Sequence, residues 1–350
     1  MNVTVARPPR QTPTGRVVFV GAVHEAEPAL RALLDGGAEV AGVVTFGPRM
    51  ATRTSGFVDL EPLAAAHGVP VLRTENLNNQ EEVERVRALR PDLIVAVGWT
   101  RLLSDELLAI PPRGCVGFHA SMLPRDRGRA PVNWAIIRGE TSTGNTMMFL
   151  ASGTDTGDII DQRSVSIEPD DTCGTVYAKV GAAGAAMLLE NLPALLDGTA
   201  RRRPQGSSPT PDLPKRTPDM GITDWTRTPR AVHDWIRGLT HPYPGAFTFL
   251  AGHKLLLWRS EPPADEPDGE PGLLLGCEGK ALRVGTGGVG SLRLLRVQEE
   301  GGTEEDAASW YRRRRLDPGR RFDPVDEATA RWALGLGRAT SVAARQEASA

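Results

Sequence analysis

The sequence predicts an α/β protein in which a Rossmann-like, doubly wound, mostly parallel sheet is followed by a smaller, mainly β C-terminal domain. Three observations lead to this prediction. In the first half of the chain, short apolar runs rich in β-branched residues alternate with segments of helical spacing. A stretch rich in proline, serine and basic residues at 201–218 then interrupts this alternation. Beyond it, short strand-like runs separated by glycine and proline are typical of a small barrel or sandwich.

Continuous apolar strands separated by helices indicate a parallel sheet that is covered on both faces. The expected strands are 16–23, 40–46, 69–72, 92–98, 115–121, 146–150 and 158–167. The expected helices are 27–34, 60–67, 80–89, 131–138 and 175–196. Pro131 suits a first helical turn, and Asp170 and Asp171 favour the start of the last helix. The turn after the first strand has neither G-x-G-x-x-G nor G-x-x-x-x-G-K-[ST], so a dinucleotide or nucleotide cofactor is not indicated.

The same signals divide the 350 residues into five parts. We expect a disordered N-terminus at 1–15, a main α/β domain at 16–200 and a linker at 201–218. A small β-rich domain follows at 219–322, and a C-terminal tail at 323–350 is expected to fray. The expected strands of the small domain are 245–250, 254–259, 272–275, 282–284 and 291–297.

Composition excludes several classes of protein. With 40% hydrophobic and 24% charged residues the chain has the composition of a globular protein, and its net charge of −2 gives no overall basic footprint for nucleic acid. Cys115, Cys173 and Cys277 form no disulfide framework or metal pattern and are expected to be small buried thiols in a reducing compartment. Residues 1–15 do not have the pattern of a signal peptide, and no run approaches the ~20 apolar residues that span a bilayer. We therefore expect a cytoplasmic protein with no membrane partner.

Two ionisable residues are placed where a ligand could reach them. His119 ends a predicted buried strand, and Asp155 lies in a glycine-rich loop, GTDTGD, before another strand. A histidine with a carboxylate partner is a standard general acid/base pair, and Asn133, Ser121 and Asn145 are candidate neutral hydrogen-bond donors. Taken separately, His119 is more simply a structural residue and Asp155 a turn residue.

Four short motifs give the segment from 114 to 162 a family resemblance. They are HASMLP from His119, RGRAP at 127–131, Gly139-Glu-Thr with Thr143-Gly144, and Asp155-x-Gly-Asp. The segment resembles the catalytic segment of the 10-formyltetrahydrofolate-dependent formyltransferases, which include the methionyl-tRNA, glycinamide ribonucleotide and nucleotide-sugar enzymes. The resemblance covers roughly residues 16–322, which implies that 16–200 is the catalytic domain and disfavours the short glycinamide ribonucleotide enzymes.

The resemblance implies formyl transfer from 10-formyltetrahydrofolate, as cosubstrate, to an amine. In the family an Asn, a His and an Asp act on the reacting carbonyl; the His falls at His119 and the Asp at Asp155, whereas the Asn position holds Gly117. Glycine offers no side-chain donor for the oxyanion. Three alternatives stay open: Asn133, Ser121 or Asn145 supplies the donor, His119 carries the oxyanion stabilisation as an imidazolium, or catalysis is weakened or altered.

The resemblance also implies where the two substrates bind. The cosubstrate would lie along two loops, at Gly98, Trp99, Arg101 and Leu102, and at Gly153 and Thr154. For an acceptor with a diphosphate and a base or sugar, the candidate residues are Arg125, Arg127, Arg129 and Trp134.

We expect the acceptor to be the primary amine of an amino sugar, nucleotide-linked or part of a specialised metabolite. The net charge is slightly negative, the arginines at 312–315 lie among acidic residues, and the loop after the second strand is short for the basic loop of the tRNA enzymes. The alternative is methionyl-tRNA. A third hypothesis, suggested by Gly117, is a non-catalytic folate-binding or interaction module. A homodimer stays open.

Overall fold

The computed structural model describes residues 15–261, 269–288 and 290–337, so nearly all of the expected disordered N-terminus, and residues 338–350 of the expected tail, lie outside the described part. The chain forms two compact units. The first unit contains the residues up to His119 together with Thr146–Arg163 and Gly181–Gly206. The second contains Ala120–Asn145, Ser164–Val180 and the residues from Ser207 onward. The chain therefore passes between the units several times.

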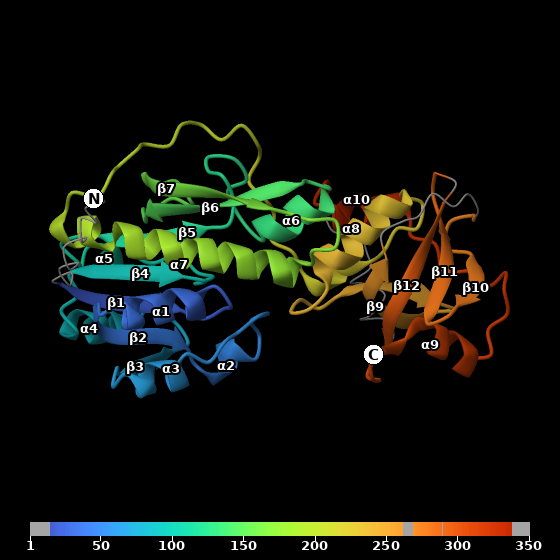
Figure 1. The fold of residues 1–350 in the computed structure, drawn as a ribbon, viewed down its shortest axis with the longest axis horizontal. Helices are drawn as coiled ribbons and strands as arrows, with labels where there is room; N and C mark the ends of the chain where they lie inside the picture. Colours follow the sequence, from blue (N-terminus) through green and yellow to red (C-terminus); the bar gives the residue numbers. More distant parts are fainter. Residues whose placement is uncertain (1–14, 262–268, 289, 338–350) are drawn as a thin grey trace, which may run out of the picture. The chain divides into compact units, whose positions relative to one another are not determined.

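A seven-stranded sheet organises the first unit, in the order β3-β2-β1-β4-β5-β6-β7 (Figure 1). Strands β1 to β5 pair in parallel, and β6 runs antiparallel to β5. This confirms the predicted Rossmann-like, mostly parallel sheet. The strands are β1 (Arg16–Gly21), β2 (Glu39–Phe46), β3 (Val71–Thr74), β4 (Leu93–Val97), β5 (Cys115–His119), β6 (Ser142–Phe149) and β7 (Ile159–Ser166).

Alternation along the strands sends neighbouring side chains into two different cores. In β1, Val17 and Phe19 pack with helices α1, α3 and α7, whereas Val18 and Val20 pack with α4 and α5. The helices of this part of the chain are α1 (Ala26–Asp35), α2 (Pro48–Ala51), α3 (Glu61–Ala66), α4 (Gln80–Ala88), α5 (Asp105–Leu108) and α7 (Cys173–Asp197). None of the described helices, 25-residue α7 included, is long and apolar enough to cross a membrane.

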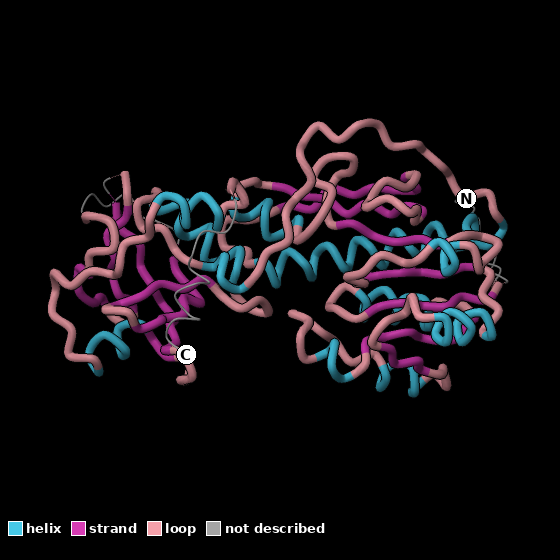
Figure 2. The backbone as a smooth tube through the Cα atoms, turned by 180° about the vertical axis from the view of Figure 1, so that it is seen from behind, coloured by secondary structure: helices cyan, strands magenta, loops and turns pink. Residues whose placement is uncertain are grey.

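The second unit is built on an antiparallel sheet, which Figure 2 shows among the magenta strands. The strand path is β10-β11-β12-β9-β8, with β13 paired to β12, and this confirms the smaller, mainly β C-terminal domain. Its strands are β8 (Ala246–Leu250), β9 (His253–Glu261), β10 (Leu274–Glu278), β11 (Ala281–Thr286), β12 (Gly290–Glu299) and β13 (Glu305–Asp306). The helices of this unit are α6 (Pro131–Ile137), the 3-10 turn η1 (Pro218–Gly221), α8 (Pro229–Leu239), α9 (Ala307–Arg313) and α10 (Glu327–Ala333).

Helix α8 is one of the elements of the second unit that the strand-like sequence pattern did not predict. Thr228 caps its first turn by accepting a hydrogen bond from the Ala231 amide, and Pro229 occupies the first position. Asp234 and Arg237 on this helix form a buried ion pair, with 2.6 Å between Nε and Oδ1. The Arg237 guanidinium also donates to the backbone carbonyls at 168 and 171. The buried positive charge is therefore compensated by a carboxylate and two carbonyl groups.

His233 on the same helix makes the stability of this unit depend on pH. Its Nε2 donates to the Pro169 carbonyl at 3.4 Å, and its Nδ1 lies 2.9 Å from the Ser260 hydroxyl. Burial lowers the pKa of His233 from 6.5 to about 4, so below pH 6.5 the unfolded chain takes up a proton that the folded chain does not. We expect this residue to make the free energy of unfolding about 3 kcal/mol lower at pH 4 than at pH 7, as measured with denaturant. The His233→Gln variant should not show this part of the loss. An unchanged pH dependence in the variant would contradict this assignment.

Two segments expected to be irregular contain regular structure. Residues 327–333 of the expected tail form α10, whose first turn is capped by the Asp326 carboxylate bonded to the Thr329 amide. In the expected linker, Arg203 forms an antiparallel bridge with Ile159 through two backbone hydrogen bonds of 2.8 and 3.0 Å. The start of this linker is therefore attached to the first sheet beside β7.

The cysteines are free thiols. Cys115 and Cys173 are buried, and burial raises the pKa of each to about 12, whereas Cys277 is half-buried. Neutral thiols of this kind pack as small apolar groups.

Candidate functional site

His119 and Asp155 meet at the carboxyl edge of the first sheet. Strand β5 ends at His119, and β6 runs antiparallel to it with Thr146 opposite His119. This return of the chain brings the loop that carries Asp155 back toward β5. The His119 Nδ1 lies 3.5 Å from the Asp155 Oδ2, and the two side chains are 7% and 18% exposed. The carboxylate thus gives the imidazole a fixed orientation at the edge where ligands bind in sheets of this kind.

The loop that carries Asp155 has an unusual backbone. Asp155 has φ +51°, in the left-handed region that few residues other than glycine adopt. Two residues later, a Cβ on Gly157 would lie 1.7 Å from the Phe149 carbonyl oxygen, so only glycine fits there. The sequence analysis did not single out Gln205, whose side-chain amide donates to the backbone carbonyls of Asp155 and Gly157.

The residues predicted to bind the cosubstrate lie in two loops of the first unit. Trp99 packs on Phe46 with ring centroids 4.3 Å apart, and its buried indole Nε1 has no hydrogen-bond partner among the described residues. Arg101 points its guanidinium at the sulfur of Met50, at 3.1 Å. The other members are Gly98, which has φ +61°, and the exposed Leu102, Gly153 and Thr154.

A further carboxyl lies at the same edge of the sheet. Glu25 follows β1 and occupies the N-cap position of α1. Its Cα lies 3.5 Å from the place where a Cβ on Gly181 of α7 would stand. Desolvation raises the pKa of Glu25 to about 7, so this group exchanges its proton near neutral pH. A single glutamate in a turn gave no signal in the sequence.

Comparison with known proteins identifies the family. Residues 15–192 match the family model described as formyl transferase, and residues 215–315 match formyl transferase, C-terminal domain. This chain belongs to the formyl transferase family. Bacterial relatives named methionyl-tRNA formyltransferase are 39% identical in Geobacter sulfurreducens, over 88% of this chain and 96% of the relative, and 37% identical in Bacillus subtilis, over 82% and 90%.

Solved structures share the fold of this formyl transferase. HypX from Aquifex aeolicus in complex with tetrahydrofolic acid has a TM-score of 0.63 at 20% identity, covering 89% of this chain, which spans about half (49%) of HypX. WlaRD, a sugar 3N-formyl transferase, has a TM-score of 0.59 at 15% identity, over 84% of this chain and 100% of WlaRD. Methionyl-tRNA formyltransferase from Clostridium thermocellum has a TM-score of 0.53 at 18% identity, over 70% and 92%.

The protein is therefore an enzyme that transfers formyl groups, with 10-formyltetrahydrofolate as the cosubstrate. The prediction of an amino-sugar acceptor, and of an amino sugar as the main partner, is wrong, because the curated relatives are named for methionyl-tRNA. That prediction relied on the net charge of the whole chain, on the acidic residues around the arginines at 312–315 and on the short loop after the second strand, and none of these reports how the other arginines are distributed over the surface.

The three neutral donors considered for the reacting oxyanion are all bonded within the formyl transferase fold. Each is buried and donates to a backbone carbonyl: Asn133 to Gly238 at 2.7 Å, Ser121 to Arg125 at 2.8 Å and Asn145 to Val180 at 2.9 Å. These bonds give each side chain a structural role in the second unit.

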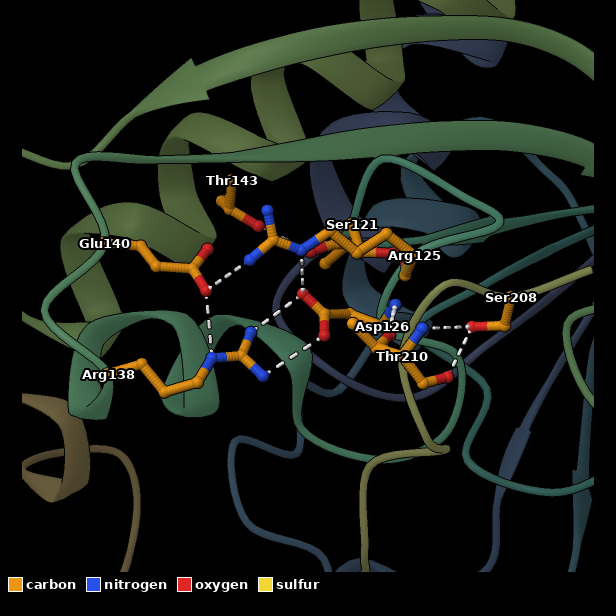
Figure 3. A network of polar contacts seen from close by, with 9 residues as sticks. Ser121, Arg125, Asp126, Arg138, Glu140, Thr143, Ser208 and Thr210 are labelled. Carbon is orange, nitrogen blue, oxygen red and sulfur yellow. Dashed lines mark hydrogen bonds and ion pairs between the residues drawn. The ribbon is translucent and has the colours of Figure 1, made fainter.

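Of the arginines considered for acceptor binding, Arg125 belongs to a network of polar contacts in the second unit (Figure 3). Arg138 bonds both carboxylate oxygens of the buried Asp126, and Arg125 and Arg138 share Glu140. Arg127 and Arg129 pair through their backbones with Leu213. Trp134 is 4% exposed, and its indole donates to the Pro214 carbonyl, so this ring is part of the core.

Gly117, where the resemblance leads us to expect the family's Asn, faces the side chain of Leu150. A Cβ on Gly117 would lie 2.6 Å from Cδ2 of Leu150 and 3.4 Å from the Ala96 carbonyl oxygen. Leu150 packs in the core that contains Ala96. The space that a side chain at position 117 would need is thus occupied by part of the Leu150 side chain.

We expect Gly117→Asn to destabilise the enzyme by about 1–3 kcal/mol, because the new side chain collides with Leu150. Leu150→Ala in the same chain should recover most of this loss, so that the two substitutions are strongly non-additive. Denaturant unfolding of the wild type, both single variants and the double variant measures this coupling. Additive effects would show that Leu150 does not compete for this space.

Proposed function

We propose that this formyl transferase formylates the amino group of methionyl-tRNA, and that it acts in the cytoplasm. The observation that carries the proposal is the name shared by curated bacterial relatives, which are 33–39% identical over 82–88% of this chain. The presence of both the catalytic and the C-terminal family domains supports it.

We assign the chemistry to His119 and Asp155. 10-Formyltetrahydrofolate supplies the activated formyl carbonyl. With Nδ1 facing Asp155, we assign Nε2 to the reaction: in its neutral form it accepts the proton that the amine loses on attacking the formyl carbon, and as the resulting imidazolium it donates to the formyl oxygen. When the bond between the formyl carbon and N10 breaks, the same proton passes to the departing nitrogen of tetrahydrofolate. Because Asn133, Ser121 and Asn145 are bonded elsewhere, His119 is our candidate for the charge stabilisation that the Asn supplies in the family.

The loop after β4 fits the cosubstrate. A buried N–H that has no protein partner ordinarily bonds to a ligand or an ordered water, and the Trp99 Nε1 has no partner within the described part of the chain. A folate ring system has both acceptor atoms and a flat face for an indole. We propose that Gly98, Trp99, Arg101 and Leu102, with Gly153 and Thr154, hold it.

Cationic side chains at the same edge of the sheet suit a phosphate backbone. Helix α2 follows the carboxyl end of β2, and the Arg49 and Arg53 side chains are exposed there. The Arg49 backbone amide donates to the Glu75 carboxylate at 3.1 Å, while neither guanidinium forms an ion pair within the described ranges. Arg101 contacts Met50 of this helix. By contrast, Arg313 and Arg314 are paired with glutamates and contribute little free charge.

The test is formylation of initiator tRNA charged with methionine, measured as formyl-methionine by mass spectrometry after release from the tRNA. We expect turnover that weakens as salt is added, and a higher KM for tRNA in Arg49→Ala and Arg53→Ala. Arg31→Ala is the matched control, because Arg31 is already paired with Glu27. Formylation of a small amine together with an absence of formyl-methionyl-tRNA would overturn the proposal.

A further inference from the structure

We propose that Gln205 is a positioning residue that holds the Asp155 carboxylate toward His119. Its Nε2 donates to the carbonyl oxygen of Asp155 at 3.0 Å and to that of Gly157 at 2.7 Å. The inference rests on the proposed catalytic roles of His119 and Asp155. Through these two bonds Gln205 acts on the backbone of the loop that carries the carboxylate.

One amide that bonds both carbonyls fixes the turn between them. Asp155 has φ +51°, a conformation that costs free energy for a non-glycine residue and that the two bonds from Gln205 help to hold. Rotation of the peptide units at 155–157 would break one or both bonds. With the turn fixed, the Asp155 side chain leaves the backbone in the direction that places Oδ2 3.5 Å from His119 Nδ1.

The chain that carries Gln205 is itself anchored to the sheet. Arg203 pairs with Ile159 at the start of β7 through two backbone hydrogen bonds. Its guanidinium bonds the side-chain oxygen of Gln162, whose amide donates to the Thr146 hydroxyl at 2.9 Å. Thr146 lies opposite His119 in the β5–β6 ladder. The anchor of Gln205 and the strand of His119 therefore belong to one connected set of contacts.

Gln205→Glu tests this role because it keeps the size of the side chain and replaces its N–H donor by an oxygen. We expect kcat to fall about 10- to 100-fold, since small displacements of a catalytic group have effects of that size, while the KM values for 10-formyltetrahydrofolate and methionyl-tRNA stay within about 2-fold. Gln298→Glu is the matched control, because Gln298 donates to the Gly302 carbonyl in the second unit. Its kcat should match that of the wild type.

A double-mutant cycle separates positioning from a general structural role. In an Asp155→Asn background, Gln205→Glu should lower the residual rate by less than about 2-fold, because the carboxylate that it positions is gone. A further loss equal to that in the wild-type background would overturn the proposal.

Hydrogen exchange gives a readout that does not depend on the acceptor. Amides at 153–158 should exchange faster in Gln205→Glu than in the wild type, and remain unchanged in Gln298→Glu. Unchanged exchange in this loop would also overturn the inference. If the wild type does not formylate methionyl-tRNA, the proposed function fails and the exchange measurement alone decides whether Gln205 holds the loop.

Discussion

His119→Ala is expected to lower the rate of formyl transfer about 10³- to 10⁴-fold while leaving the fold intact. The side chain ends β5, so its removal opens the edge of the sheet without removing a member of the main cores. The variant loses both the proton carrier and the group assigned to the developing charge, each of which contributes at least about 10²-fold. Single-turnover formyl transfer at saturating cosubstrate measures this loss.

A second histidine–aspartate pair in the same unit provides the control. His67 Nε2 lies 3.7 Å from Asp35 Oδ1, at the ends of two helices and away from β5. His67→Ala removes a similar contact and should leave the rate within about 2-fold of the wild type. Activity of His119→Ala close to that of His67→Ala would contradict the assignment of the active site.

Gly157→Ala should cost both activity and stability. A Cβ at this position would lie 1.7 Å from a backbone oxygen, and no side-chain movement can relieve that contact. The loop must shift, which moves Asp155 away from His119. We expect a fall in kcat of about 100-fold or more, with a loss of about 3 kcal/mol in the free energy of unfolding.

Gly206→Ala is the companion substitution for this prediction. A Cβ on Gly206 meets nothing within 4 Å, so the added methyl group should be tolerated. Kinetics and denaturant unfolding of the two variants, measured side by side, distinguish a specific steric requirement from the general effect of replacing glycine. Wild-type kinetics in Gly157→Ala would show that the loop tolerates a different path.

Strands β1, β2 and β4 of the first sheet could be predicted because they bury both faces, which makes an apolar run of the right length nearly unambiguous. Helix α8 could not, because its buried face includes His233, Asp234 and Arg237, which a pattern search counts as polar and exposed. His233 and Arg237 bond to partners from distant parts of the chain, and Asp234 is paired with Arg230 and Arg237 of the same helix.

The site was predictable only in part. His119 and Asp155 stand in recognisable motifs, and the structure brings them together. Gln205 gave no such signal, since a glutamine in a proline-rich stretch has the composition of a linker. Trp134 illustrates the opposite error, because proximity to the motif in sequence gave it a binding role, whereas the structure places it in a core.

The bridge between Arg203 and Ile159 sets a limit on how the polypeptide can be shortened. A fragment that stops at Ala200 would retain the complete sequence signature from His119 to Asp158. It would nevertheless lack the short extended piece that supports the turn bearing Asp155. A fragment designed to keep that turn in place should end beyond Gly206, several residues past the last helix of the first unit.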